Sequence, residues 1–209
     1  MTQSKSSKNW LTEHFKDGYV KQAKDAGYRA RSAYKLLEIQ KKDHLIKPGM
    51  VIVDLGAAPG GWSQVAVELL KGRGQMFALD ILPMEPISGV DFIQGDFTDN
   101  QVFDEFLRHL DGRKVDLVLS DMAPNLSGIS VTDQARSIYL AELALDFAER
   151  VLKPEGKCLT KVFQGAGLPA YRKALEATFK KVVVRKPKAS RDRSAEIYLL
   201  GTERERAVN

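Results

Sequence analysis

Short apolar runs alternate with longer segments of helical period along most of this 209-residue chain, and this alternation constrains the fold most strongly. The apolar runs are rich in Val, Ile and Leu, as in VIVDL at residues 51–55. Such runs are typical of strands that are covered on both faces of a parallel sheet. Repeated strand–helix–strand units therefore predict an α/β fold, with helices on both faces of one sheet.

The expected elements can be placed along the chain from these periods. We expect seven strands, at residues 51–55, 75–81, 90–94, 115–120, 156–163, 180–186 and 195–201. We expect helices at residues 30–42, 62–71, 99–111, 131–152 and 168–179. In the fourth helix, residues at three- and four-residue intervals predict one buried face, formed by Ile138, Ala141, Leu145, Ala148 and Leu152.

The last two expected strands are separated by the short segment PKASRDRS, which has no helical period. Strands joined in this way pair as an antiparallel hairpin, because a parallel pair needs a longer crossover connection. The predicted architecture is therefore a Rossmann-like, seven-stranded, mostly parallel sheet with a C-terminal antiparallel hairpin strand.

Composition is that of an ordinary globular protein, and 209 residues fit a single domain, over residues 1–209, with a basic N-terminal extension over about residues 1–28. No stretch is apolar enough for a membrane helix, and the polar first ten residues lack the apolar core of a secretion signal. We therefore expect a cytoplasmic monomer that does not associate with membranes. The single cysteine excludes an internal disulfide. The three histidines are scattered along the chain, so we expect no metal site.

Positive charge is concentrated at the two ends of the chain. Residues 1–35 hold eight Lys/Arg against three Asp/Glu, and residues 180–209 hold nine against four. The residues between them, 36–179, hold fifteen against twenty. Two basic ends around an acidic body are typical of a nucleic-acid-binding protein, although solvated charged tails give the same pattern.

A Gly-rich turn follows the first expected strand, in the segment VIVDLGAAPGGWS at residues 51–63. Gly56, Gly60 and Gly61 remove side chains that would keep a ligand away from the backbone, and the next helix begins with unpaired N–H groups. The turn is neither a G-x-G-x-x-G fingerprint nor a P-loop. Asp54, at the end of the strand, would repel a pyrophosphate but suits the positive charges of S-adenosylmethionine.

Two further carboxylates follow the next two expected strands. Asp80 ends the second strand, where a carboxylate can accept hydrogen bonds from both ribose hydroxyls of an adenosine, and Asp96 can accept one from an adenine amino group. Each residue taken singly is equally consistent with capping a turn. The ordered set with the Gly-rich turn favours a nucleoside site, in which Trp62 either lines the pocket or packs beside it.

Asp121 and Lys161 end the fourth and fifth expected strands, which we expect to be neighbours. Their side chains would then meet at the same sheet edge as the cofactor. The segment after Asp121, MAP, lacks the Asp/Asn-Pro-Pro-aromatic pattern of enzymes that methylate exocyclic amines. Cys158 lies three residues before Lys161 and therefore faces the other side of its strand. We interpret Cys158 as buried and inert, not as the nucleophile of a cytosine-5 methyltransferase.

Four residues form a more specific pattern, each within a short segment: Lys35 in YRARSAYKL, Asp121 in SDMAP, Lys161 in TKVF and Glu196 in RSAEIY. Together with the turn DLGAAPGGW, this ordered set resembles the RrmJ/FtsJ family of 2'-O-ribose methyltransferases, and the similarity spans residues 10–201.

The resemblance implies a reaction, a partner and roles for individual residues. The reaction would be methyl transfer from S-adenosylmethionine to the 2'-hydroxyl of a uridine ribose in large-subunit ribosomal RNA. The partner would be ribosomal RNA or the large ribosomal subunit. Lys161 would be the catalytic base, and the cofactor contacts would be Gly60, Trp62, Asp80, Asp96 and Asp121, beside Asp54 and Gly56 of the turn.

The chemistry of ribose methylation is consistent with this set. A ribose hydroxyl is a very weak acid, so the enzyme must hold its oxygen in line with the methyl group and help to remove its proton. Our hypothesis is that Lys161 accepts the proton or steers the oxygen lone pair, while Lys35 and Glu196 position the hydroxyl. Taken singly, Lys35 is better explained by a solvated helix face and Glu196 by a solvated strand face.

Because Lys35 and Glu196 belong to the two basic ends, these ends should flank the mouth of the site. The candidate phosphate contacts are Lys5, Lys8, Lys16, Lys21, Lys24, Arg29, Arg31, Lys180, Lys181, Arg185, Lys186, Lys188, Arg191 and Arg193. Two alternatives stay open: a methyltransferase for a small-molecule or protein substrate, and a catalytically weak RNA-binding or ribosome-assembly factor that shares the fold.

Overall fold

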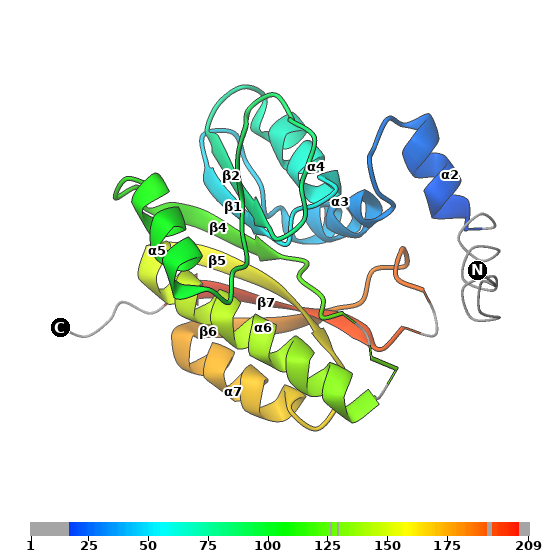
Figure 1. Cartoon of the computed structure of the whole chain (residues 1–209), viewed down its shortest axis with the longest axis vertical. Helices are drawn as coiled ribbons and strands as arrows, with labels where there is room; N and C mark the ends of the chain where they lie inside the picture. The colour runs from blue at the N-terminus through cyan, green and yellow to red at the C-terminus, as the bar shows by residue number, and fades with distance from the viewer. Residues whose placement is uncertain (1–16, 126, 129, 192–193, 205–209) are drawn as a thin grey trace.

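In the computed structural model, which describes residues 17–125, 127–128, 130–191 and 194–204, the strands form one sheet in the order β3-β2-β1-β4-β5-β7-β6 (Figure 1). The strands are β1 (Val51–Leu55), β2 (Gln75–Asp80), β3 (Val90–Gln94), β4 (Val115–Ser120), β5 (Leu152–Phe163), β6 (Phe179–Arg185) and β7 (Glu196–Arg204). The first five strands in this order, β3, β2, β1, β4 and β5, pair in parallel. Strand β7 runs antiparallel to both of its neighbours, β5 and β6.

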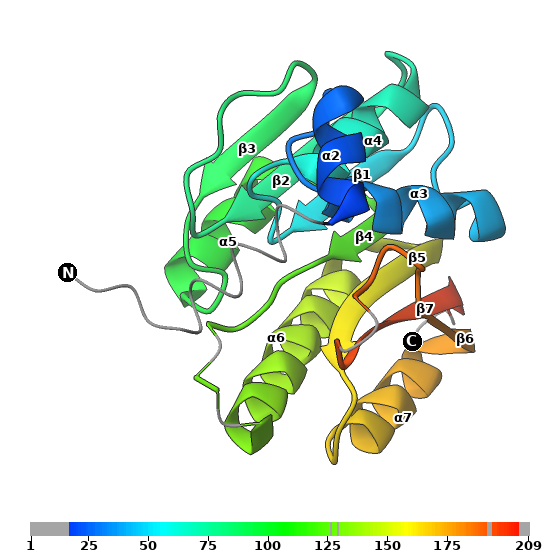
Figure 2. The same cartoon turned by 90° about the vertical axis from the view of Figure 1, so that its right-hand side faces the viewer.

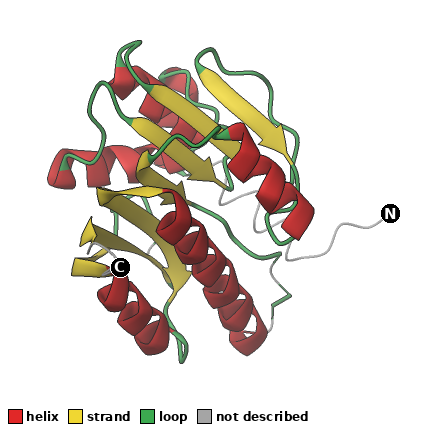
Figure 3. Cartoon of the chain, turned by 90° about the vertical axis from the view of Figure 1, so that its left-hand side faces the viewer, coloured by secondary structure: helices red, strands yellow, loops and turns green. Residues whose placement is uncertain are grey.

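Helices cover both faces of this sheet, as the views of Figures 2 and 3 show. The helices are α2 (Gly18–Asp25), α3 (Ser32–Asp43), α4 (Gly61–Leu70), α5 (Asn100–His109), α6 (Ser130–Val151) and α7 (Leu168–Thr178). One hydrophobic cluster joins the sheet to α5, α6 and α7, and a second joins the other face to α3 and α4. The predicted α/β architecture is therefore confirmed.

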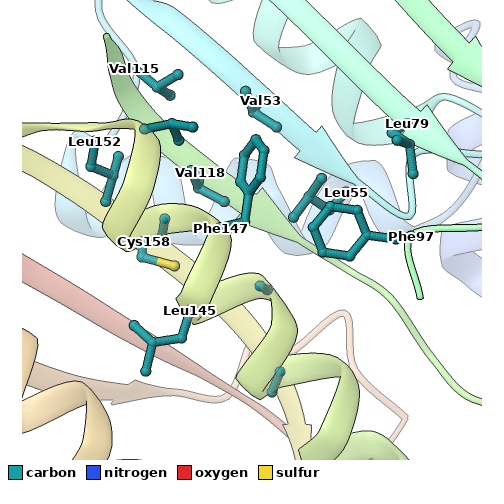
Figure 4. Packing of buried hydrophobic residues seen from close by; sticks show 14 of the residues in the cluster. Val53, Leu55, Leu79, Phe97, Val115, Val118, Leu145, Phe147, Leu152 and Cys158 are labelled. Carbon is teal, nitrogen blue, oxygen red and sulfur yellow. The ribbon is translucent and has the colours of Figure 1, made fainter. Parts of the chain in front are cut away.

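The core next to α6 shows how the apolar pattern of the sequence is used. Phe147 of α6 is fully buried and lies over β1 and β4 (Figure 4), and its ring stacks on Phe106 at a centroid distance of 5.5 Å. In β5, Cys158 and Val162 face this cluster, whereas Leu159 faces the opposite one. Alternate residues of this central strand are thus buried on both sides, as expected for a strand that helices cover on both faces.

Two details of the predicted elements differ from the structure. Leu152, which we expected on the buried face of the long helix, is the first residue of β5 and pairs with Val115 of β4. The ladder then shifts register before Lys157 pairs with Leu117. The chain therefore passes from α6 into the sheet without a loop, and the helical spacing of Leu152 was coincidental. Helix α2, which the sequence analysis did not predict, lies within the basic extension.

The predicted antiparallel hairpin is confirmed, and the structure adds its position. Strand β7 lies between β5 and β6, so β6 forms the edge of the sheet. The candidate phosphate contacts Lys5, Lys8, Lys16 and Arg193 lie outside the described residues. None of the helices within the described ranges is long and apolar enough to span a membrane.

Gly201 of β7 provides a test of packing at this pairing. A Cβ atom added there would lie 2.5 Å from Cδ2 and 2.7 Å from Cγ of the buried Phe179 ring. We expect Gly201→Ala to lower the free energy of unfolding by about 1–3 kcal/mol, because a well-packed core cannot accept the added methyl group. Chemical denaturation measures this difference.

The matched control is Gly18→Ala at the start of α2, where an added Cβ would meet no atom within 4 Å. Its free energy of unfolding should change by less than about 0.5 kcal/mol. Equal stabilities of the two variants would contradict the packing described for Gly201.

Candidate functional site

A pocket of about 410 Å³ lies at the carboxyl ends of β1, β2 and β4. It combines three carboxylates with apolar side chains, and its lining residues are Gly56, Ala58, Leu79, Asp80, Ile81, Leu82, Asp96, Phe97, Asp121, Met122, Ala123, Asn125 and Leu140. Four of the predicted cofactor residues therefore line the pocket, namely Gly56, Asp80, Asp96 and Asp121. Asp54, Gly60 and Trp62 are not among the lining residues.

Asp80 and Asp96 shape the loops that carry them. Asp80 accepts hydrogen bonds from the backbone N–H groups of Ala58 and Leu82, both at 2.8 Å. Asp96 Oδ1 accepts from the N–H and the hydroxyl of Thr98, at 2.9 and 2.7 Å. The turn-capping role is thus present at both positions. It leaves room for ligand contacts, because each carboxylate oxygen has two lone pairs.

Asp54 is fully buried beneath the Gly-rich turn. Its Oδ2 accepts a hydrogen bond from Ser63 Oγ at 2.8 Å, and its Oδ1 has no hydrogen-bond partner among the described residues. Burial, reinforced by the neighbouring charges of Asp121 and Asp80, raises the pKa of Asp54 to about 7. An unpaired buried acceptor is costly, and a positively charged ligand nearby would relieve that cost.

Gly60 allows a second loop to close onto the turn. Its φ of 112° is in the left-handed region that favours glycine, and an added Cβ would lie 2.6 Å from Ile87 Cδ1. Arg29 fastens the same contact, since its guanidinium donates to the carbonyl oxygens of Pro59, Glu85 and Pro86. Arg29, which we predicted as a phosphate contact, therefore ties together two loops beside the pocket.

Trp62 has a packing role in the structure. Its indole Nε1 donates to the carbonyl of Ser32 at 2.8 Å, and its ring lies 5.5 Å from that of Tyr198. The side chain is buried and links the start of α4 to α3 and β7. Trp62 therefore packs beside the pocket and does not line it.

The four predicted catalytic residues form two ion pairs. Lys161 Nζ lies 3.0 Å from Asp121 Oδ1 and donates to the backbone oxygen of Asp121 at 2.5 Å. Lys35 Nζ lies 2.5 Å from Glu196 Oε1. All four side chains are largely buried, and Lys161 is only 8% exposed. The structure therefore brings together residues that are up to 161 positions apart in the sequence.

Tyr198 links the two pairs, and the sequence analysis did not identify it. Its hydroxyl donates to Asp121 Oδ1 at 2.8 Å, and Lys35 Nζ lies 5.9 Å from the centre of its ring. Tyr198 pairs directly with Lys161 across β5 and β7. The available signal was its position two residues after Glu196, which places both on one face of a strand.

The charges of this cluster are balanced. Burial by itself would raise the pKa of Asp121, but the positive charges of Lys161 and Lys35 and hydrogen bonds outweigh it and hold that pKa below its usual range. Burial, together with the charge of Asp121, raises the pKa of Tyr198 well above its usual value. At neutral pH, Asp121 is therefore a carboxylate and Tyr198 a neutral hydrogen-bond donor.

Cys158 is buried on the opposite side of β5, as predicted. Burial and the charge of Glu149 raise the pKa of its thiol to about 12. The predicted burial is confirmed, and a thiol of this kind supplies almost no thiolate at neutral pH, which agrees with the inert interpretation.

The candidate phosphate contacts separate into two groups. Some are engaged within the protein: Arg31 pairs with Asp17, Arg185 pairs with Asp43, and Lys186 donates to two backbone carbonyls. Others are exposed and form no ion pair with the described residues, namely Lys21, Lys24, Lys180, Lys181 and Lys188. The second group remains free to contact an anion.

Comparisons with known proteins identify the family of the chain. A model of the FtsJ-like methyltransferase family matches residues 28–204. Ribosomal RNA large subunit methyltransferase E of Azoarcus sp. (strain BH72) is 61% identical over 203 residues, covering 97% of this chain and 99% of that protein. The protein of the same name from Alkalilimnicola ehrlichii is 64% identical over 194 residues, covering 93% of each.

Solved structures show the same architecture. The crystal structure of a Plasmodium falciparum protein described as a ribosomal RNA methyltransferase superposes with a TM-score of 0.76 and 31% identity, over 85% of this chain and 98% of that one. Fibrillarin from Aeropyrum pernix, solved with bound S-adenosyl-L-methionine, shares the fold at a TM-score of 0.60 and 20% identity, over 84% and 75% of the two chains. Because the family model covers most of the sequence and the relatives match nearly end to end, the chain belongs to the FtsJ-like methyltransferase family.

Proposed function

We propose that this protein transfers a methyl group from S-adenosylmethionine to the 2'-hydroxyl of a ribose, in a uridine of large-subunit ribosomal RNA. One observation carries the proposal: Asp121 lines the nucleoside-sized pocket and at the same time holds the amine of Lys161. Asp121 would therefore fix both the position of the methyl donor and the position of the amine that handles the proton.

The residues of the pocket fit the cofactor. Asp80 and Asp96 supply acceptors for ribose hydroxyls and an adenine amino group, while Ile81, Leu82 and Phe97 supply apolar contacts for a base. Asp54 lies beneath the turn with an unpaired oxygen, which suits a ligand with positive charge. When bound, S-adenosylmethionine supplies a methyl group that is already activated by its positively charged sulfur.

The protein then has to orient the ribose oxygen and manage its proton. An ammonium group has three N–H donors, and Lys161 directs two of them to Asp121. As an ammonium, Lys161 donates its third N–H to the 2'-oxygen of the substrate and so steers that atom. As a neutral amine, it keeps its two N–H groups on Asp121, turns its lone pair toward the hydroxyl and becomes the ammonium by accepting the proton. Lys35, held by Glu196, lies 5.9 Å from the centre of the Tyr198 ring and positions the same hydroxyl.

RNA as the substrate is supported by the relatives' names and by the distribution of charge. The relatives at about 60% identity are called ribosomal RNA large subunit methyltransferases. Exposed lysines on α2, on β6 and in the loop after β6 are available for phosphate groups. A ribose within folded RNA must be exposed before it can enter the site, and binding of the surrounding backbone would favour that state.

The decisive assay follows labelled methyl transfer to naked ribosomal RNA, large subunits and whole ribosomes, with mapping of the modified nucleotide. In this assay we expect Lys161→Ala to lower the rate by about 10²–10⁴-fold with cofactor affinity within twofold of the wild type. Lys157→Ala, on the same face of β5 but outside the pocket, should retain full activity.

Methylation of free nucleosides or peptides as fast as RNA would contradict the proposed substrate. Near-normal turnover by Lys161→Ala would remove Lys161 from the mechanism. A wild-type protein that binds ribosomal RNA and transfers no methyl group would favour the assembly-factor alternative.

The raised pKa of Asp54 predicts a pH-dependent cofactor affinity. Asp54 loses its proton as the pH rises through about 7, and the resulting negative charge attracts a cation. We expect the Kd for S-adenosylmethionine to fall about tenfold between pH 6 and pH 8, measured by calorimetry. Asp54→Asn should bind weakly with little pH dependence, whereas Asp104→Asn, exposed on α5, should behave like the wild type. A steep pH dependence in Asp54→Asn would assign the effect to another group.

The proposed RNA contacts predict a strong salt dependence. A plot of the logarithm of RNA affinity against the logarithm of salt concentration should be steep, and Lys188→Ala should reduce its slope by about 1. Lys153→Ala, whose lysine is paired with Asp116 near the starts of β5 and β4, should leave the slope unchanged. Affinity that is flat across the salt range would exclude a phosphate-binding surface.

A further inference from the structure

The loop between β6 and β7 packs beside α3, next to the Lys35–Glu196 pair (Figure 1, orange). Loop residues are usually exposed, yet Ala189 and Ser190 are only 0% and 4% exposed. Ser190 Oγ donates a hydrogen bond at 2.8 Å to Glu196 Oε1. The same oxygen accepts from Lys35 Nζ, so the ion pair has a third, buried member.

One face of α3 holds this loop in place. Arg31, Lys35 and Glu38 are spaced four and three residues apart, so they lie along one side of the helix. The Glu38 carboxylate accepts from the backbone N–H groups of Lys188 and Ala189, at 2.6 and 2.9 Å. Arg31 donates to the carbonyl oxygen of Ala189. The helix that carries Lys35 therefore also fixes the peptide that carries Ser190.

The other end of the loop is fixed as well. Lys186 Nζ donates to the carbonyl oxygens of Ser194 and Glu196, both at 2.6 Å. The pairing of β7 and the Lys186 amine therefore hold the backbone of Glu196. The side-chain torsions of Glu196 are then set by the groups that its carboxylate contacts. Lys35 alone is a weak constraint, because two long side chains lose much rotamer freedom when they pair.

We propose that Ser190 is a positioning residue for the Lys35–Glu196 pair. Its hydroxyl orients the Glu196 carboxylate, and the carboxylate in turn holds the Lys35 amine toward the substrate hydroxyl. This inference rests on the proposed function and deepens it, because it assigns the buried loop to the geometry of the methyl acceptor. Ser190 acts through Glu196 and does not touch the substrate.

Ser190→Ala tests the inference by removing a single oxygen atom from a buried site. At saturating cofactor and RNA we expect the methylation rate to fall about tenfold, which corresponds to the loss of one hydrogen bond to a charged group. The KM for RNA and the Kd for the cofactor should stay within twofold of the wild type. Tyr171→Phe, which removes a buried hydroxyl of α7 in the cluster on the opposite face of the sheet, should keep the wild-type rate.

A double-mutant cycle separates positioning from a merely structural role. In a Glu196→Ala background, Ser190→Ala should cause less than a twofold further loss, because its effect passes through Glu196. A full tenfold loss in that background, or a wild-type rate for Ser190→Ala alone, would overturn the inference. If Ser190→Ala does not fold, Ser190→Cys keeps a weaker donor at similar volume and should show a smaller loss with the same dependence on Glu196.

The same measurements keep the two proposals apart. The wild-type rate on ribosomal RNA tests the proposed function, whereas the ratio of rates within the cycle tests Ser190. An active wild-type protein with additive losses would overturn the role of Ser190 and leave the proposed function standing.

Discussion

The antiparallel pairing of β7 with β5 is the contact on which the rest of the site depends. Its register sets Tyr198 opposite Lys161 and Glu196 opposite Phe163, so one face of β7 carries Glu196 and Tyr198 alongside the last residues of β5. The parallel pairing of β4 with β5 brings Asp121 to the same edge from the other side. Main-chain hydrogen bonds therefore hold the two ion pairs a few ångströms apart, and a slip of one residue would turn each β7 side chain to the opposite face.

Helix α3 and the segment that precedes it connect the two halves of the site. Arg29 joins the Gly-rich turn to the loop after β2, through the carbonyls of Pro59, Glu85 and Pro86. Arg31 and Glu38 hold the loop between β6 and β7. Lys35 lies between them in the sequence and enters the cluster beneath both loops. Residues at the basic N-terminal end thus serve the internal geometry of the site as well as any contact with RNA.

Charge balance explains how so many ionisable groups share one small region. Burial and the negative charges of Asp121 and Asp80 together disfavour the ionised form of Asp54. Lys161 and Lys35 keep Asp121 ionised, whereas the buried Asp54 has a pKa raised to about 7. Asp121 therefore borders two regions, because it lines the pocket of the proposed cationic cofactor and also pairs with Lys161.

The sequence by itself determined the alternation of strands and helices, the Gly-rich turn, the inert Cys158 and the order Lys35, Asp121, Lys161, Glu196. These features are local, because apolar period, glycine content and the parity of a strand are properties of neighbouring residues. Tertiary structure alone decided that Tyr198 bonds to Asp121 and that Ser190 bonds to Glu196. It also decided that Trp62 packs against Tyr198 and that Leu152 begins a strand. It also decided that Arg29, Arg31 and Arg185 are engaged inside the protein. The physical reason is that each of these roles depends on strand order, register and loop closure, which bring together groups that are distant along the chain and carry no mark of their partners in the local sequence.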